Sequence, residues 1–178
     1  MPISQEQVVK HLQPPTGITM PPYPKERDRL YRWTLWAIAL GMTGEGAALA
    51  ISSPLLTFAA QGWTALAVLA ASLSFLVWLS SWRYLVRTLA VVGLLLWPWW
   101  HLGGWAASLI ATAIMAAKET HCFHFPAGKI IPWYSLFFGP VLLSPLPAKA
   151  LAAGWVILAA LWWWLAHDRS RLPLFEVN

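Results

Sequence analysis

From Leu30 onward, long apolar runs alternate with short polar or proline-containing breaks almost to the end of the chain. A helix needs roughly 17–25 apolar residues to cross a bilayer core of about 30 Å. The breaks lie at segments such as Ser52–Pro54, Ser80–Arg83 and Ser144–Lys149. The runs between the breaks predict six transmembrane helices, at Trp33–Ile51, Gly62–Ser80, Tyr84–Trp100, Leu102–Ala117, Ile130–Leu146 and Ala150–Ala166.

The same pattern divides the chain into three parts. Residues 1–29 contain six prolines and neither an apolar core nor a small-residue cleavage site, so they are predicted to form an extended cytoplasmic arm rather than a signal peptide. Residues 30–167 are predicted to form the six-span bundle, and residues 168–178 a short cytoplasmic tail.

Composition supports a membrane class. The chain is 58% hydrophobic and 11% charged, whereas an ordinary soluble domain has about 25% charged residues. Such a chain has too little polar surface to cover a water-facing globule. We therefore predict an all-α, multi-pass membrane protein. The net charge of +5 is spread over short clusters between apolar runs, which argues against nucleic-acid binding.

The positions of the basic residues predict the orientation. Six spans place both termini and the second and fourth connections on one side of the membrane. Of the 12 basic residues, only Lys149 falls on the opposite side, which leaves 12 − 1 = 11 on the first. Basic residues accumulate in cytoplasmic loops, so both termini are predicted to be cytoplasmic.

The segment Ala116–Trp133 holds the candidate chemistry of the chain, because it combines the single cysteine with two histidines and a Lys-Glu pair. Cys122 could act as a reactive thiol in a redox protein, with a neighbouring histidine as base. His121, Cys122 and His124 could begin a metal site, although structural zinc sites normally use two separated ligand pairs. The third interpretation is a partner-binding surface, formed by Lys118, Glu119, Phe123 and Lys129.

Glu45 is the other polar candidate, because it lies within the first predicted span between two glycines. About 1.5 Å of rise per residue places it roughly 18 Å beyond Trp33. Ionisable residues at that depth are usually functional, so Glu45 suggests a carrier of protons or small solutes. If this span instead begins nearer Leu30, Glu45 approaches the outer interface and needs little functional explanation.

The fourth predicted span carries small residues at four-residue spacing. This spacing lines up one face of a helix on which a second helix can pack closely. The face consists of Gly104, Ser108, Thr112 and Ala116.

The segment Lys118–Phe123 resembles the bacterial and cyanobacterial integral membrane proteins called the domain of unknown function 2301 family. The resemblance rests on Lys118, Glu119, Cys122 and Phe123, followed by Lys129 and Pro132, and on an earlier group at the first span, Asp28, Arg29, Tyr31 and Arg32. It extends from about Asp28 to Leu146. It implies a multi-span inner-membrane or thylakoid protein, with biogenesis of photosynthetic complexes as one setting.

We therefore expect a non-enzymatic accessory or assembly subunit of a larger membrane complex, photosynthetic or respiratory, that contacts the lipid bilayer and other membrane subunits. No catalytic residue and no cofactor are predicted. A variant of this hypothesis binds pigment or haem, with His101 or His167 as axial ligand. The alternatives are a thiol- or metal-dependent redox protein using Cys122 and a carrier using Glu45.

Overall fold

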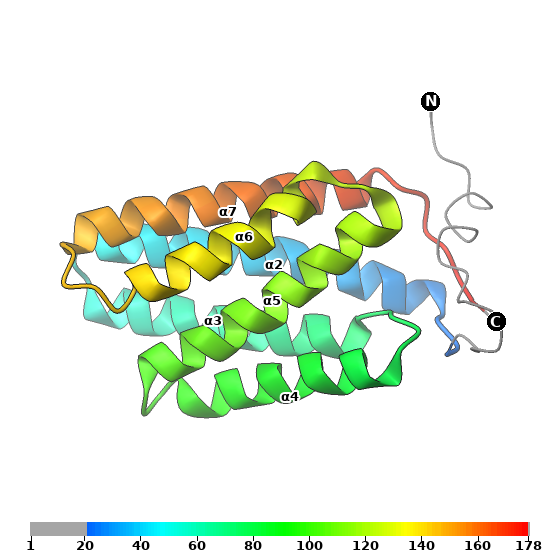
Figure 1. The fold of residues 1–178 in the computed structure, drawn as a ribbon, viewed down its shortest axis with the longest axis horizontal. Coiled ribbons are helices and arrows are strands. Elements are labelled where there is room, and N and C mark those ends of the chain that lie inside the picture. The colour runs from blue at the N-terminus through cyan, green and yellow to red at the C-terminus, as the bar shows by residue number, and fades with distance from the viewer. Residues whose placement is uncertain (1–20, 178) are drawn as a thin grey trace.

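The computed structural model describes residues 21–177, and these residues form an all-helical bundle. The helices are α2 (Lys25–Ala50), α3 (Pro54–Ser74), α4 (Ser80–Leu96), α5 (His101–Phe123), α6 (Pro126–Val141) and α7 (Ala148–Ser170). Consecutive helices run in opposite directions along the long axis of the molecule (Figure 1). As a result, α2, α4 and α6 begin at the end of the bundle where α3, α5 and α7 finish.

Each described helix overlaps one predicted span, but the boundaries differ. Helix α3 begins eight residues before Gly62 because Pro54, which lacks a backbone N–H, stands at its first position and Ser53 caps it. Helix α2 begins at Lys25, inside the predicted extended arm, and residues 1–20 of that arm lie outside the described residues. Helix α7 continues to Ser170, into the predicted tail.

The break between α5 and α6 has a local cause. His124 adopts a left-handed conformation with φ of 59°, and its N–H donates to the carbonyl of Thr120 at 2.8 Å. A left-handed residue immediately after a helix satisfies one of the last free carbonyls. Pro126 then begins α6. One histidine of the candidate segment therefore ends a helix.

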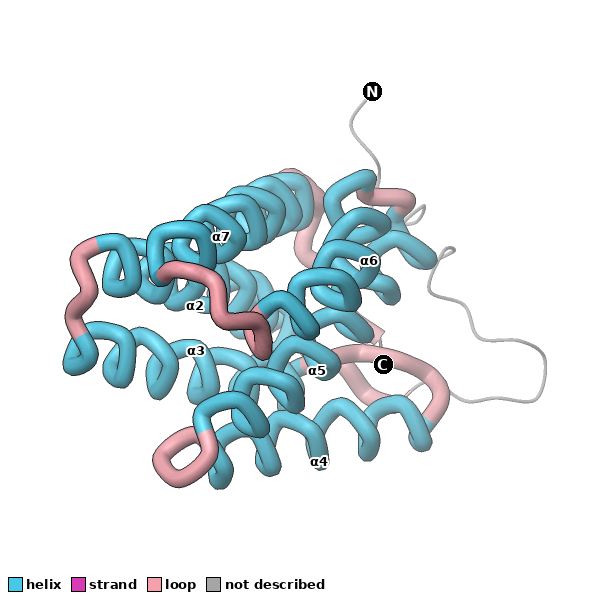
Figure 2. The backbone as a smooth tube through the Cα atoms, turned by 60° about the vertical axis from the view of Figure 1, so that its left-hand side comes forward, coloured by secondary structure: helices cyan, strands magenta, loops and turns pink. Residues whose placement is uncertain are grey.

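Helix α2 packs against α3 and α7, while α5 packs against both α4 and α6. In the rotated view, α5 lies between α4 and α6 (Figure 2). The main core contains fully buried tryptophans of α7, Trp155 and Trp162, together with Leu35 and Ile38 of α2. The bundle thus has one main apolar core, and a second, smaller apolar cluster contains Tyr23, Cys122 and Phe175.

Two described helices, α3 and α7, are long and apolar enough to cross a membrane. Helices α4 and α6, with 17 and 16 residues, are at or below the short limit of roughly 17 residues for crossing a bilayer core. Large apolar side chains also face outward, among them Leu55 at 76% exposure and Phe137 at 70%. The fold is therefore all-helical with membrane-type helices, and the count of six spans stays a prediction.

Candidate functional site

A cluster of charged side chains lies where α2 begins and where α5 and α7 end. Asp28 and Arg32 come from the first turns of α2, Lys118 and Glu119 from the end of α5, and Arg169 from the end of α7. Asp28, Glu119 and Arg169 are completely buried, and Lys118 is 8% exposed. Buried charges require partners, because removing them from water is expensive.

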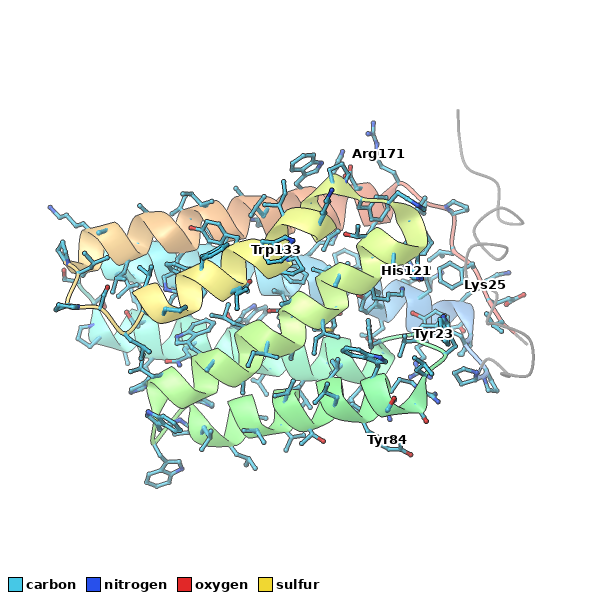
Figure 3. All side chains as sticks on the ribbon, viewed as in Figure 1. Tyr23, Lys25, Tyr84, His121, Trp133 and Arg171 are labelled. Atoms are coloured by element: carbon cyan, nitrogen blue, oxygen red, sulfur yellow. The ribbon has the colours of Figure 1, made fainter. Side chains whose placement is uncertain are left out.

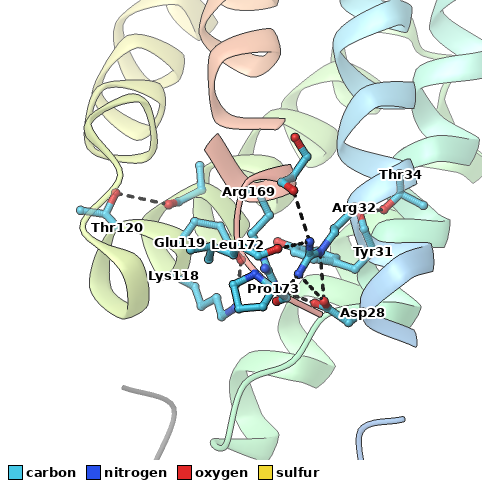
Figure 4. Close-up of polar contacts among 12 residues, drawn as sticks. Asp28, Tyr31, Arg32, Thr34, Lys118, Glu119, Thr120, Arg169, Leu172 and Pro173 are labelled. Atoms are coloured by element: carbon cyan, nitrogen blue, oxygen red, sulfur yellow. Dashed lines mark hydrogen bonds and ion pairs between the residues drawn. The ribbon is translucent and has the colours of Figure 1, made fainter. Parts of the chain in front are cut away.

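Arg169 joins the two buried carboxylates (Figure 4). Its Nη2 donates to Oδ1 of Asp28 at 2.5 Å, and its Nε lies 3.2 Å from Oε2 of Glu119. Lys118 completes the arrangement, with Nζ 2.9 Å from Oε1 of Glu119. These contacts connect α2, α5 and α7 through one guanidinium, which has the several donors that such bridging needs.

Arg32 connects the cluster to the segment after α7. It pairs with Asp28, one turn earlier on α2, with Nη2 2.7 Å from Oδ2. Its guanidinium also donates to the carbonyl of Leu172 at 2.6 Å and to that of Pro173 at 2.7 Å. The C-terminal segment is therefore held by charge-assisted hydrogen bonds, which are stronger than neutral ones.

Aromatic rings enclose the cations. The guanidinium of Arg169 lies 4.8 Å from the ring centroid of Phe123 and 5.1 Å from that of Phe175. The ammonium of Lys118 lies 5.1 Å from the centroid of Phe123 and 5.7 Å from that of Tyr31. Such contacts attract a cation to the ring face and exclude water from the ion pairs.

The two ends of the described chain meet over this cluster. Tyr23 and Val177 form an antiparallel bridge, with N–H to carbonyl distances of 2.8 and 3.0 Å. The ring of Tyr23 stacks on that of Phe175 with centroids 5.5 Å apart. Tyr23 and Lys25 lie at the end of the bundle where α5 finishes (Figure 3). This pairing closes the charged cluster from outside.

Electrostatics keep the carboxylate of Glu119 ionised. Burial opposes its charge, but Lys118 and Arg169 more than compensate, so that the pKa of Glu119 falls below its ordinary value. A carboxylate with a lowered pKa is a poor proton carrier at neutral pH. The arrangement therefore suits a fixed ionic connection between helices, which we call the ion cluster (Asp28, Arg32, Lys118, Glu119 and Arg169).

The burial of Lys118 and Glu119 corrects the prediction that these charges lie on a cytoplasmic surface. Lys118 forms an ion pair with Glu119, and Glu119 also contacts Arg169. Both side chains are buried because α7 and the C-terminal segment cover the end of α5. Phe123 is half-buried, and its ring is in tilted contact with those of Phe125 and Phe175. Lys129, at the start of α6, is exposed. Of the proposed partner-binding residues, only Lys129 is fully exposed.

Cys122 and its neighbouring histidines do not converge. The Cys122 side chain is 5% exposed, and burial raises the pKa of its thiol, which disfavours the reactive thiolate. His121 and His124 are exposed, and no group of three or more His, Cys, Asp or Glu side chains suited to a metal occurs among residues 21–177. This geometry does not favour the redox alternative.

The remaining histidine candidates lie far apart. His101 begins α5, where its Nδ1 lies 3.0 Å from Oε1 of Gln61. His167 is exposed near the end of α7, at the opposite end of the bundle. The structure therefore does not bring them to one site.

Glu45 is buried in α2 at 3% exposure and borders a cavity of about 600 Å³. This cavity also contacts Gln61 and His101, near the end of the bundle opposite the ion cluster. The sequence singled out Glu45 and His101 separately, and the fold brings them to the same cavity.

The small-residue face of α5 packs against α4 and α6. Its members are buried, and a Cβ on Gly93 of α4 would come within 2.6 Å of the Ser108 hydroxyl. A Cβ on Gly128 of α6 would meet the carbonyl oxygen of Ala116 at 2.6 Å. The face thus allows α4 and α6 to approach α5 closely. Its residues are Gly104, Ser108, Thr112 and Ala116.

Sequence reasoning missed Arg169, which it assigned to the short cytoplasmic tail. It noted Asp28 and Arg32 only through the family resemblance. Their four-residue spacing on one helix was an available signal for an ion pair. Nothing in the local sequence indicates that Arg169, separated from Asp28 by 141 residues, would meet it.

No known protein family, curated protein or solved structure matches this chain. The resemblance seen at Lys118–Phe123 accordingly stays a prediction.

Proposed function

We propose that this chain is a six-span protein of the cell inner membrane or thylakoid membrane, with cytoplasmic termini, that serves as an accessory or assembly subunit of a larger membrane complex. The observation that carries the proposal is an apolar groove on α5, between α4 and α6. A transmembrane helix of a partner subunit is the occupant that suits this groove.

Charge distribution supports the membrane orientation. The ion cluster and the exposed Arg171 and Lys129 lie at the end of the bundle where α2 begins and α7 finishes. Lys149 is the one basic residue described near the other end. Exposed apolar side chains cover the helices between, such as Trp133 on α6 (Figure 3). Lipid would cover these side chains, whereas water would leave a large unfavourable apolar surface.

The groove has a volume of about 600 Å³ and is lined by side chains of α4, α5, α6 and the α3–α4 loop. Ala113 and Ala117 on α5 are small, so a helix backbone could approach closely there. Ser135 of α6 borders the groove at 6% exposure, and its hydroxyl has no hydrogen-bond partner. Close packing and interhelical hydrogen bonds are the interactions that associate helices within lipid.

The orientation is tested with topology reporters. Reporters fused near Gln7 and at Asn178 should both respond as cytoplasmic, because the basic residues accumulate at that side. A reporter placed within Trp99–Gly103 should respond as external. A cytoplasmic response from the α4–α5 connection would overturn the six-span count.

The docking proposal is tested by filling the groove. Ala113→Trp places an indole on its floor, whereas Ala160→Trp places the same indole on an exposed face of α7. Both variants and the native chain are purified in mild detergent, and co-purifying membrane proteins are quantified by mass spectrometry. We expect a membrane protein that co-purifies with the native chain and with Ala160→Trp to be lost from the purified Ala113→Trp variant. Equal retention by all three chains would refute docking at this groove.

A further inference from the structure

The cavity beside Glu45 lies away from the groove and the ion cluster. It is bordered by α2, α3, α5 and α7 near the α2–α3 turn, where Ser52 and Ser53 lie. Its volume of about 600 Å³ falls within the range of small-molecule sites, about 300–1,000 Å³.

Glu45 has an unsatisfied carboxylate oxygen. Its side chain is 3% exposed, and Oε2 has no hydrogen-bond partner among the described residues. Trp105 lies beside this carboxylate in the cavity wall. A buried carboxylate without a full set of partners is costly, and a cationic ligand would remove this cost.

The cavity has one acidic side chain, that of Glu45, and no basic counterpart from lysine or arginine among its lining residues. This contrasts with the ion cluster, where each carboxylate has cations from the chain itself. His101 is the other titratable lining group. Its ring is oriented by the contact of Nδ1 with Oε1 of Gln61 at 3.0 Å, and Nε2 of Gln61 donates to the His101 carbonyl at 3.1 Å.

Aromatic rings form much of the wall. Trp105 and Trp155 border the cavity with ring centroids 4.1 Å apart, and Phe58 borders it from α3. Rings next to a carboxylate are the surroundings that bind substituted ammonium ions, because the ring face attracts positive charge while the ring surface covers the alkyl groups. Inorganic cations would instead need several oxygen ligands.

We propose that this cavity binds a small organic ammonium ion, with its cationic nitrogen beside the carboxylate of Glu45 and its apolar groups against Trp105 and Trp155. This site is independent of the proposed docking groove. The Gln61–His101 pair supplies polar groups for a hydroxyl or amide elsewhere on the ligand.

The test uses the full chain in mild detergent and isothermal titration calorimetry. The probe is benzyltrimethylammonium, and the charge-reversed comparison is benzylsulfonate, which has a similar shape. Glu45→Gln removes the carboxylate charge. Glu26→Gln makes the same change on the exposed first turn of α2, about 28 Å away at about 1.5 Å per residue.

We expect saturable one-to-one binding of benzyltrimethylammonium and no comparable binding of benzylsulfonate. Glu45→Gln should weaken the binding by at least about tenfold, and Glu26→Gln should leave it unchanged. Absence of saturable binding, equal binding of both ions, or full affinity in Glu45→Gln would overturn the proposal. The comparison of the two ions uses the native chain, so it decides the matter even if Glu45→Gln fails to fold.

Discussion

Replacing Arg169 with methionine tests whether the ion cluster holds the helix ends together. Methionine keeps much of the length and apolar volume of arginine but removes the guanidinium that contacts Asp28 and Glu119. Breaking a buried ion pair by removing one partner typically costs about 3–5 kcal/mol. Each carboxylate would keep one cation, Arg32 at 2.7 Å or Lys118 at 2.9 Å. We therefore expect a loss near the lower limit, about 3 kcal/mol.

The loss is measured as a change in the free energy of unfolding in detergent micelles, by denaturant titration of near-ultraviolet circular dichroism. Arg171→Met is the matched control, because Arg171 is exposed two residues further along the chain and should cost almost nothing. A double-mutant cycle with Glu119→Gln isolates the coupling between the two residues. If Arg169→Met and Arg171→Met have equal stability, the ion cluster does not stabilise the fold and our reasoning is wrong.

The pKa of Glu119 is lowered on folding, so its ionised form should stabilise the fold above the ordinary glutamate pKa. This stabilisation should disappear as the pH falls through the lowered pKa, and the melting temperature should fall with it. A melting temperature that does not change on acidification would contradict this. Gly128→Ala should destabilise the fold by about 1–3 kcal/mol, because the added Cβ would overlap the α5 backbone. Gly139→Ala should be tolerated, because no atom lies within 4 Å of the position of its Cβ. Equal melting temperatures for the two variants would refute this packing. Cys122 should react slowly with a maleimide until the chain is denatured, as followed by mass spectrometry, and rapid labelling of the folded chain would contradict its burial.

The helices themselves could be predicted because their signal is local. Apolar runs separated by proline and serine breaks located every described helix, although α3 begins at Pro54 rather than Gly62. The error arose because the start of this helix depends on a cap at Ser53, which hydropathy alone does not detect. The number of these helices that cross a membrane stays a prediction, with α3 and α7 long and apolar enough to do so.

The candidate site was predicted only in part. The residue types of Lys118, Glu119 and Glu45 drew attention from sequence because charges are rare in this chain. Their environments could not be predicted, since a helix-end charge has the same local sequence whether it faces solvent or an arginine from another helix. Burial distinguishes these cases, and burial results from the packing of segments far apart in the chain.

Residue types and their spacing along the chain were enough to predict that it is helical, apolar and divided by short polar breaks. The contact of Glu119 with Arg169 inside the bundle, and the cavity beside the unpaired carboxylate oxygen of Glu45, became visible once the helices were packed together. The physical reason is that the cost of a buried charge depends on its surroundings in three dimensions. Antiparallel packing brought Arg169 to Glu119 and the rings of Trp105 and Trp155 to Glu45.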